Sequence, residues 1–397
     1  MLISYRVIMI AVFTVAMNTF AMSQPQLGRI YGRITIDGGD VLEGRISWGD
    51  HEMIWSHTFD ASYDFYDHNR EAYWRAREYR GDRDRNLEAE FISYFGDIKS
   101  IERSGSRALL MMKNGREFEV FDGEVGDDVY VNDKELGEIE LGWRDIDMIE
   151  FMDEPETYSR YSGENAFPIY GRVFTRSDYR FKGFIMWDND ESLSTHILDG
   201  NDGKDDREIP FSRIRTITPD TRRSSKVVLI AGTELTLSGT NDVNDDNSGL
   251  IIADPEYGII GIEWRDLERV EFEHNVPAKR FSDFKPGKPL EGTVTDSAGD
   301  EYTGYIRWDD DESVTTDFLN GEVDGFDIKI PFSNIKEIRR RTRRSALVTL
   351  KTGVELRLSG SNDVDEDNKG IVILKQLGDQ EAVMLSWDEF EKVIFSQ

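Results

Sequence analysis

The sequence predicts an all-β protein built from three tandem copies of one unit of roughly 110 to 120 residues. Tryptophans mark the repeat, because Trp187 and Trp308 are 121 residues apart and Trp143 and Trp264 are also 121 residues apart. Apolar and polar residues alternate over short segments with a glycine at each reversal, as in residues 348–358. This pattern is typical of antiparallel hairpins.

The chain begins with a segment typical of a secretory signal peptide. Residues 1–23 contain one basic residue, Arg6, then an apolar run over 7–15, and they end in the small-x-small pattern of 21–23 that signal peptidase reads. A retained anchor is the alternative, but the apolar run is shorter than the ~20 residues of a spanning helix. We expect cleavage near Gln24, export to the periplasm or beyond, and no transmembrane segment in the mature chain.

Composition narrows the classes of function. The chain has 78 acidic and 48 basic residues and no cysteine, for a formal net charge of −30. Without cysteine there is neither a disulfide framework nor a thiol nucleophile, and no lipoprotein anchor can form. A field of this sign repels nucleic acid and favours cations or basic partners. We therefore expect no nucleic-acid binding.

The three units are predicted at 28–152, 167–272 and 290–397, with polar connectors between them. A mid-unit segment such as 209–217 and an end-of-unit segment such as 264–272 share one pattern: an aromatic residue, two polar residues, an apolar residue, two polar residues and another apolar residue. We interpret this pattern as a single helical turn followed by a strand. Each unit is thus expected to consist of two related halves of about 50 residues.

The order of these segments is similar to small SH3-like and Sm-like β-barrels. In unit 2 a strand led by Gly171 is followed by a second strand around Gly183 and then by the closing segment Ile209-Pro210-Phe211. The resemblance implies two small SH3-like barrels in each unit. One β-sandwich for each unit is the alternative.

Unit 1 carries an insertion of about 63–87, because Trp48 and Ile98 are 50 residues apart where the matching pairs of units 2 and 3 are 27 apart. It is rich in aromatic and arginine side chains, and a short helix is expected over 69–79. Such a composition is enriched at binding interfaces, which favours a protein partner; packing as a lid on its own unit is the alternative. The candidate partner-binding residues are Tyr66, Tyr73, Trp74, Arg77 and Tyr79.

Units 2 and 3 share a loop rich in Asp and Asn. Oxygen side chains recur at every second position, the spacing with which EF-hand-like loops begin to surround Ca²⁺. Loop position 12, where a bidentate acidic ligand belongs, is Ala253 or Leu374 instead. The alternative is a loop whose side chains bond their own backbone. Calcium is the only cofactor that the sequence suggests, with candidate ligands Asp242, Asn244, Asp246, Asp363, Asp365 and Asp367.

A second set of polar residues follows the first tryptophan of each unit. A glutamate comes four residues later, and His57, His196 or Asp317 comes nine residues later. This set could form part of a metal or proton-transfer site. Structural pairing inside the turn is the competing interpretation. The three glutamates are Glu52, Glu191 and Glu312.

Enzyme signatures are missing from the sequence: it has no nucleophile elbow, no phosphate-binding glycine loop and no HExxH motif. We therefore expect an exported, non-enzymatic binding or scaffolding repeat protein of the cell envelope. A calcium-dependent adhesive or matrix protein is the first alternative, and a hydrolase with an unrecognised site is the second.

Overall fold

A computed structural model describes residues 28–49, 51–64, 88–158, 166–277, 279–309, 311–377 and 382–396. The predicted signal segment lies outside these residues, as do the five candidate partner-binding residues and the expected helix of the insertion. The prediction of an all-β fold is confirmed, since the described elements are β-strands and single-turn 3-10 helices. No helix in these ranges is long and apolar enough to span a membrane.

Unit 1 is one antiparallel sheet in the order β4-β3-β7-β6-β5-β10-β1-β2-β8-β9. Its strands are β1 (Tyr31–Ile36), β2 (Val41–Trp48), β3 (Thr58–Asp64), β4 (Glu88–Tyr94), β5 (Ile98–Ser104), β6 (Arg107–Met112), β7 (Glu117–Phe121), β8 (Val129–Asp133), β9 (Gly137–Leu141) and β10 (Ile146–Phe151).

Unit 2 repeats this order as β14-β13-β17-β16-β15-β20-β11-β12-β18-β19. Its strands are β11 (Tyr170–Thr175), β12 (Arg180–Trp187), β13 (Ile197–Asn201), β14 (Asp206–Pro210), β15 (Ile214–Thr221), β16 (Ser224–Leu229), β17 (Glu234–Ser238), β18 (Leu250–Asp254), β19 (Gly258–Ile262) and β20 (Leu267–Phe272).

Unit 3 has an eight-stranded sheet, β27-β26-β25-β30-β21-β22-β28-β29, and a separate hairpin, β23–β24. Its strands are β21 (Glu291–Asp296), β22 (Glu301–Arg307), β23 (Phe318–Val323), β24 (Phe326–Pro331), β25 (Ile335–Thr342), β26 (Ser345–Leu350), β27 (Glu355–Leu358), β28 (Ile371–Leu374), β29 (Ala382–Leu385) and β30 (Phe390–Phe395).

The two halves of each unit are present, but they are not separate closed barrels. In unit 1 the first half is β3 to β7, and the second half is β8 to β10 completed by β1 and β2 from the beginning of the unit. Pairing of β5 with β10 joins the two halves into one open sheet. The expectation of two closed barrels is therefore wrong, because β5 pairs with β10 of the other half and β4 and β9 are left at the two ends of the sheet.

In five of the six shared segments the opening aromatic residue starts a single 3-10 turn, as predicted; in the sixth, at 387–389, it starts a turn that is not a 3-10 helix. Phe95–Asp97 (η1) precedes β5 and Trp143–Asp145 (η2) precedes β10. These aromatic rings lie in one core with Trp48, which is 5.8 Å from Phe95 and 6.1 Å from Trp143 between ring centroids. Because the rings come from both halves, each unit has a single core rather than two.

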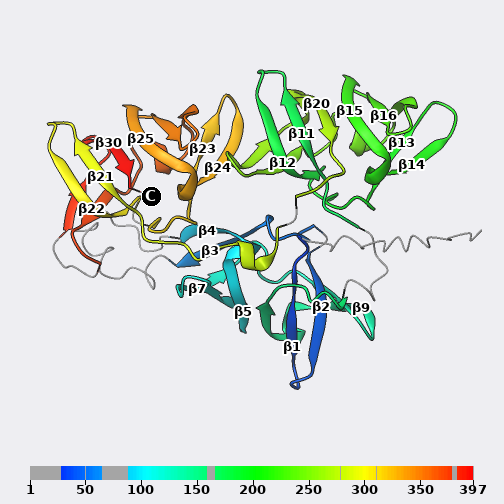
Figure 1. Ribbon diagram of the computed structural model, residues 1–397, viewed down its shortest axis with the longest axis horizontal. Helices are drawn as coiled ribbons and strands as arrows, with labels where there is room; N and C mark the ends of the chain where they lie inside the picture. Colours follow the sequence, from blue (N-terminus) through cyan, green and yellow to red (C-terminus); the bar gives the residue numbers. More distant parts are fainter. Residues whose placement is uncertain are drawn as a thin grey trace, which may run out of the picture.

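Units 2 and 3 share a continuous sheet (Figure 1). β19, which lies at the end of the strand order of unit 2, pairs with β24 of unit 3, so that Ile260 lies opposite Ile328. Both side chains belong to a single apolar core that extends through both units. Gly258 permits this approach, because a Cβ atom there would lie 2.1 Å from the carbonyl oxygen of Lys329. The β23–β24 hairpin therefore binds unit 3 to its neighbour.

Unit 1, drawn in blue and cyan in Figure 1, lies across the other two units. Its β4 faces the hairpin of unit 3, with the Tyr94 and Phe318 rings 5.1 Å apart. Arg116 forms a two-pronged ion pair with Asp317, in which Nη1 is 3.0 Å from Oδ2. Such a planar arrangement fixes geometry as well as charge. It brings residues 201 positions apart in the sequence into contact.

Candidate functional site

In units 2 and 3 the acidic loop holds the first tryptophan of the unit in place. Trp187 Nε1 donates to the carbonyl oxygen of Asp242 at 3.1 Å, and the Asp242 carboxylate accepts from the amide of Asp199 at 2.6 Å. Asp363 makes the same pair of contacts in unit 3, with Trp308 Nε1 at 2.9 Å and the Asn320 amide at 2.6 Å. Two of the six candidate calcium ligands therefore bond the surrounding backbone.

The remaining candidate ligands also bond their own loop or lie at the surface. The Asn244 side chain accepts from the Asp246 amide at 2.7 Å, and Asp365 accepts from the Asp367 amide at 2.8 Å. These are Asx turns, in which a side chain substitutes for a backbone acceptor. Asp246 and Asp367 are exposed. Over the residues that the structure describes, no three His, Cys, Asp or Glu side chains are placed to hold a metal ion.

Unit 1, whose sequence lacks this loop pattern, uses Glu124 instead. The Glu124 carbonyl oxygen accepts from Trp48 Nε1 at 2.9 Å, and its carboxylate accepts from the Asp60 amide at 2.6 Å. The interaction is thus common to all three units even though its residue type changes. The sequence pattern does not reveal it, because the two kinds of loop differ in length and composition.

The repeated histidine position has the same role in all three units. His57 Nδ1 accepts from the Met53 amide at 3.2 Å, and His196 Nδ1 accepts from the Ser192 amide at 3.3 Å. In unit 3 the Asp317 carboxylate accepts from the amides of Ser313 and Val314. Burial lowers the pKa of His57 to about 3, so its ring is neutral and free to accept. The geometry therefore supports the interpretation in which each of these side chains bonds backbone amides of its own turn.

A cluster of carboxylates lies beside the first tryptophan in units 2 and 3; two members of each cluster are buried, and of the rest Glu191, Asp311 and Glu312 are partly buried and Asp190 is exposed. The first aspartate has a positive φ, 54° at Asp188 and 46° at Asp309, and the matching residue of unit 1 is Gly49. Aspartate tolerates this conformation better than most residues because its side chain bonds locally. Asp188 accepts from Asn241 and from the Ser248 amide. The cluster of unit 2 is Asp188, Asp190, Glu191 and Asp242; that of unit 3 is Asp309, Asp311, Glu312 and Asp363.

The two clusters differ in one cation. Lys369 enters the cluster of unit 3, with its Nζ 3.6 Å from both Asp309 and Asp311. The matching residue of unit 2 is Ser248, which has no charge to offer. Burial raises the pKa of Glu191 to about 10 and that of Asp242 to about 6. Glu191 is therefore protonated at neutral pH, because desolvation disfavours its charged form.

A cleft lies where all three units meet, and we call it the central cleft. It has a volume of about 770 Å³. Unit 1 contributes Tyr94 and Asp97, unit 2 contributes Asp254, and the connector and unit 3 supply most of the remaining wall. Its basic residues are Lys279, Lys285, Lys288 and Lys351, its acidic residues are Asp97, Asp254, Asp283 and Glu291, and its prolines are Pro255, Pro286, Pro289 and Pro331.

The connector between units 2 and 3 is fixed to unit 1 beside this cleft. Lys113 of unit 1 donates to the carbonyl oxygen of Phe284 at 3.1 Å and lies over the Phe281 ring at 3.3 Å. A Cβ atom on Gly96 would lie 2.4 Å from the Phe284 ring, so only glycine allows this contact. The wall of the cleft is therefore held by packing at the point where it contacts unit 1.

None of the four lysines of the central cleft forms an ion pair among the described residues, although Lys285 donates to the carbonyl oxygen of Ser282 at 2.7 Å. Lys288 and Lys351 are exposed, and their side chains take part in no salt bridge there. Lys279 is more buried, with its Nζ 4.0 Å from the centroid of the Phe284 ring. Burial lowers the pKa of Lys279 and raises the pKa of Asp97 to about 7. The cleft thus offers cationic groups in a chain that is strongly acidic overall.

The central cleft was not predicted from the sequence, in which residues 273–289 have the composition of a polar connector. The available signal was the recurrence of lysine at 279, 285 and 288 in an acidic chain. Lys369 also carried a signal, since it replaces Ser248 in otherwise matching loops. Comparison of the chain with protein-family models, with curated proteins and with solved structures finds no match.

Proposed function

We propose that the protein is an exported, non-enzymatic binding or scaffolding repeat protein of the cell envelope, and that its central cleft receives an anionic segment of a partner protein. The observation that carries this proposal is the convergence of three units on one cleft in which the exposed ammonium groups of Lys288 and Lys351 form no ion pair among the described residues, although four carboxylates also line the cleft. Charge of this kind on an acidic molecule selects partners by sign.

The cleft suits an extended segment better than a folded domain. Its four prolines restrict the backbone of the walls, so little conformational entropy is lost on binding. Tyr94 and Phe284 supply aromatic surface, while Lys288 and Lys351 supply charge. Interfaces commonly combine an aromatic centre with a polar rim. A partner segment with acidic residues flanking an apolar one would match both features.

Affinity capture with a charge-reversed cleft tests the proposal. The variant Lys288→Glu/Lys351→Glu and the native chain are used to capture proteins from the native envelope fraction. The control variant Lys99→Glu/Lys336→Glu changes two exposed lysines on strands outside the cleft. We expect the native chain and the control to retain the same partner and the cleft variant to lose it. Equal retention by all three would contradict the role of the cleft.

The calcium-dependent alternative is tested in the same capture with and without chelator. The hydrogen bonds of Asp242 and Asn244 would have to break before these residues could bind Ca²⁺. The geometry therefore predicts no heat on calcium titration and no change in melting temperature. Binding heat in the native chain that Asp242→Asn abolishes would favour the adhesive or matrix protein instead.

Asp97 favours a second candidate, a hydrolase. It lines the central cleft, and burial raises its pKa to about 7, a value suited to general acid–base catalysis. The other carboxylate with a raised pKa, Asp254, already accepts from the amides of Lys182, Glu256 and Tyr257. Asp254 is therefore bonded to the backbone rather than available as a second acid–base group beside Asp97, and a binding function is better supported than hydrolysis. Hydrolysis of envelope polymers that Asp97→Asn abolishes, with stability retained, would reverse this order.

A further inference from the structure

The three units end in equivalent edge strands, and only one of these is covered within the described chain. β9, β19 and β29 each occupy the last place in the strand order of their unit. β19 is covered by β24 of the next unit, with Ile259 opposite Lys329 and Gly261 opposite Asp327. Its sequence, Gly-Ile-Ile-Gly-Ile, has no charged residue. An apolar edge strand without a neighbour would be prone to pair with another chain.

The uncovered edge of unit 1 carries charge. β9 has Glu138 and Glu140 at the positions of Ile259 and Gly261, and both glutamates are exposed. No strand pairs with the outer side of β9 in the part of the chain that the structure describes. Charged side chains on an edge strand oppose pairing with further strands. This edge is therefore protected by its own residues.

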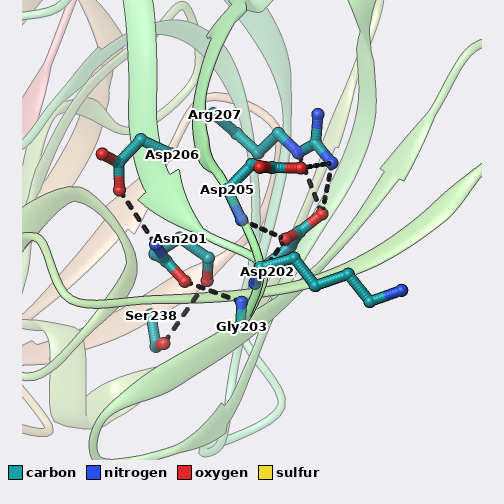
Figure 2. A network of polar contacts seen from close by, with 8 residues as sticks. Asn201, Asp202, Gly203, Asp205, Asp206, Arg207 and Ser238 are labelled. Carbon is teal, nitrogen blue, oxygen red and sulfur yellow. Dashed lines mark hydrogen bonds and ion pairs between the residues drawn. The ribbon is translucent and has the colours of Figure 1, made fainter.

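The uncovered first edge of unit 2 is charged as well. β14 contains Asp206, Arg207 and Glu208. Figure 2 shows how Arg207 and Asp206 are held at the tip of the β13–β14 hairpin. Arg207 Nη2 lies 2.6 Å from Asp202, and Asn201 Nδ2 donates to Asp206 at 2.9 Å. These contacts keep charged groups along the edge.

The edge strand of unit 3, β29, lacks this protection. β29 consists of Ala382, Val383, Met384 and Leu385, none of them charged. The first three are only half-buried, and Val383 packs on the edge of the common core. β28 covers one side of β29, and no strand among the described residues covers the other. In composition β29 thus resembles the covered β19 rather than the two charged edges.

We propose that β29 is an interface for a second copy of this chain, and that two β29 strands pair antiparallel about a two-fold axis. Such an isologous contact places the same apolar strand on both sides. It would extend the eight-stranded sheet of unit 3 into its partner, as β24 extends the sheet of unit 2 within one chain.

The other edges of a second copy fit β29 less well. If β14 paired with β29 in the way that β24 pairs with β19, Arg207 would take the place of Ile328, whose side chain is 1% exposed. An arginine at such a buried position would have to leave Asp202 and be desolvated. β4 already lies against unit 3, since Lys329 Nζ is 3.8 Å from Glu90. The self-complementary contact avoids both obstacles.

Sedimentation velocity of the chain from residue 24 onward, over concentrations of about 1 to 200 µM, tests this inference. We expect a reversible monomer–dimer equilibrium. The variant Ala382→Lys/Met384→Lys adds charge on the face of β29 opposite Val383 and Leu385, since side chains alternate along a strand. It should raise the dissociation constant at least tenfold, while the matched edge variant Glu138→Lys/Glu140→Lys in β9 leaves it unchanged.

Hydrogen exchange on the native chain gives a second measurement that needs no variant. We expect the amides of residues 382–385 to become more protected as concentration rises, while those of β9 do not change. A native chain that stays monomeric throughout would overturn the proposal. Open-ended polymers would overturn it as well, because a head-to-tail contact does not close. So would equal weakening by the β9 variant.

Discussion

The carboxylate clusters of units 2 and 3 differ at one position, which is Ser248 in unit 2 and Lys369 in unit 3. Exchanging these residues tests whether the lysine stabilises the acidic groups of unit 3. Lys369→Ser gives unit 3 the residue of unit 2. The ammonium group lies 3.6 Å from each of two carboxylates, and its side chain is 23% exposed. At an effective dielectric constant of about 20, each attraction is worth about 4 to 5 kcal/mol before desolvation is subtracted. Removal of one partner from a buried ion pair costs about 3 to 5 kcal/mol.

Because Lys369 retains some exposure, we expect Lys369→Ser to lower the free energy of unfolding by about 2 to 4 kcal/mol at pH 8. The loss should shrink at low pH. Burial raises the pKa of Asp309 to about 7 even with the lysine present. Its folded-state pKa therefore exceeds its unfolded value, so the stabilisation is complete below about pH 4 and is lost as the pH rises from there through the folded-state pKa. Stability of the variant should fall as the pH rises through 7.

Urea unfolding at pH 5 and pH 8, combined with hydrogen exchange of residues 304–312 and 371–374, measures the loss and assigns it to unit 3. Lys336→Ser removes an exposed lysine and is the control. The reciprocal variant Ser248→Lys should stabilise unit 2 at pH 8. If Lys369→Ser unfolds within about 0.5 kcal/mol of the native chain at both pH values, the lysine does not stabilise the cluster and the reasoning fails.

Three further outcomes follow from the structure. Gly258→Ala should weaken the contact of β19 with β24 while Gly137→Ala does so little, because both glycines have positive φ but only Gly258 has backbone within reach of a Cβ atom; hydrogen exchange of β24 measures the difference, and equal effects would mean that backbone strain alone is responsible. Arg116→Met should expose β4 to exchange by breaking the ion pair with Asp317, and unchanged protection would mean that aromatic packing suffices. Glu191→Gln should stabilise unit 2 relative to the native chain, and increasingly so as the pH rises from about 4.5 towards 10. Burial raises the pKa of Glu191 to about 10, so the native chain loses stability over this range because the folded state must keep a proton that the unfolded state has released. Melting temperatures from pH 5 to pH 9 that stay parallel for both chains would refute this.

Local patterns made several elements predictable. The alternation in 348–358 became the β26–β27 hairpin, since side chains of a strand point to opposite faces in turn. The aromatic-led segments became 3-10 turns followed by strands, as at Phe211–Arg213 before β15. Both features depend on residues within a few positions of one another. The Asx alternative for the acidic loops was also open to sequence reasoning, because those bonds join near neighbours.

The partners of edge strands could not be predicted in this way. Nothing in the sequence of β24 indicates that it pairs with β19 of the preceding unit, or that β1 and β2 complete the half that ends with β10. Backbone pairing depends on which edges meet in space, and the hydrogen-bonding groups of all strands are alike. The charges of Glu138 and Glu140 are typical of an edge strand without a neighbour, but this interpretation is possible only after the strand order is known.

The sequence by itself determined the repeat, the strands and the acidic character, because these follow from periodicity and composition. Only the tertiary structure decided that Lys369 enters a cluster of buried acids, that Arg116 meets Asp317, and that three units enclose a lysine-lined cleft. Each of these is a long-range contact. Its strength depends on distance and burial, which exist only once the chain has folded.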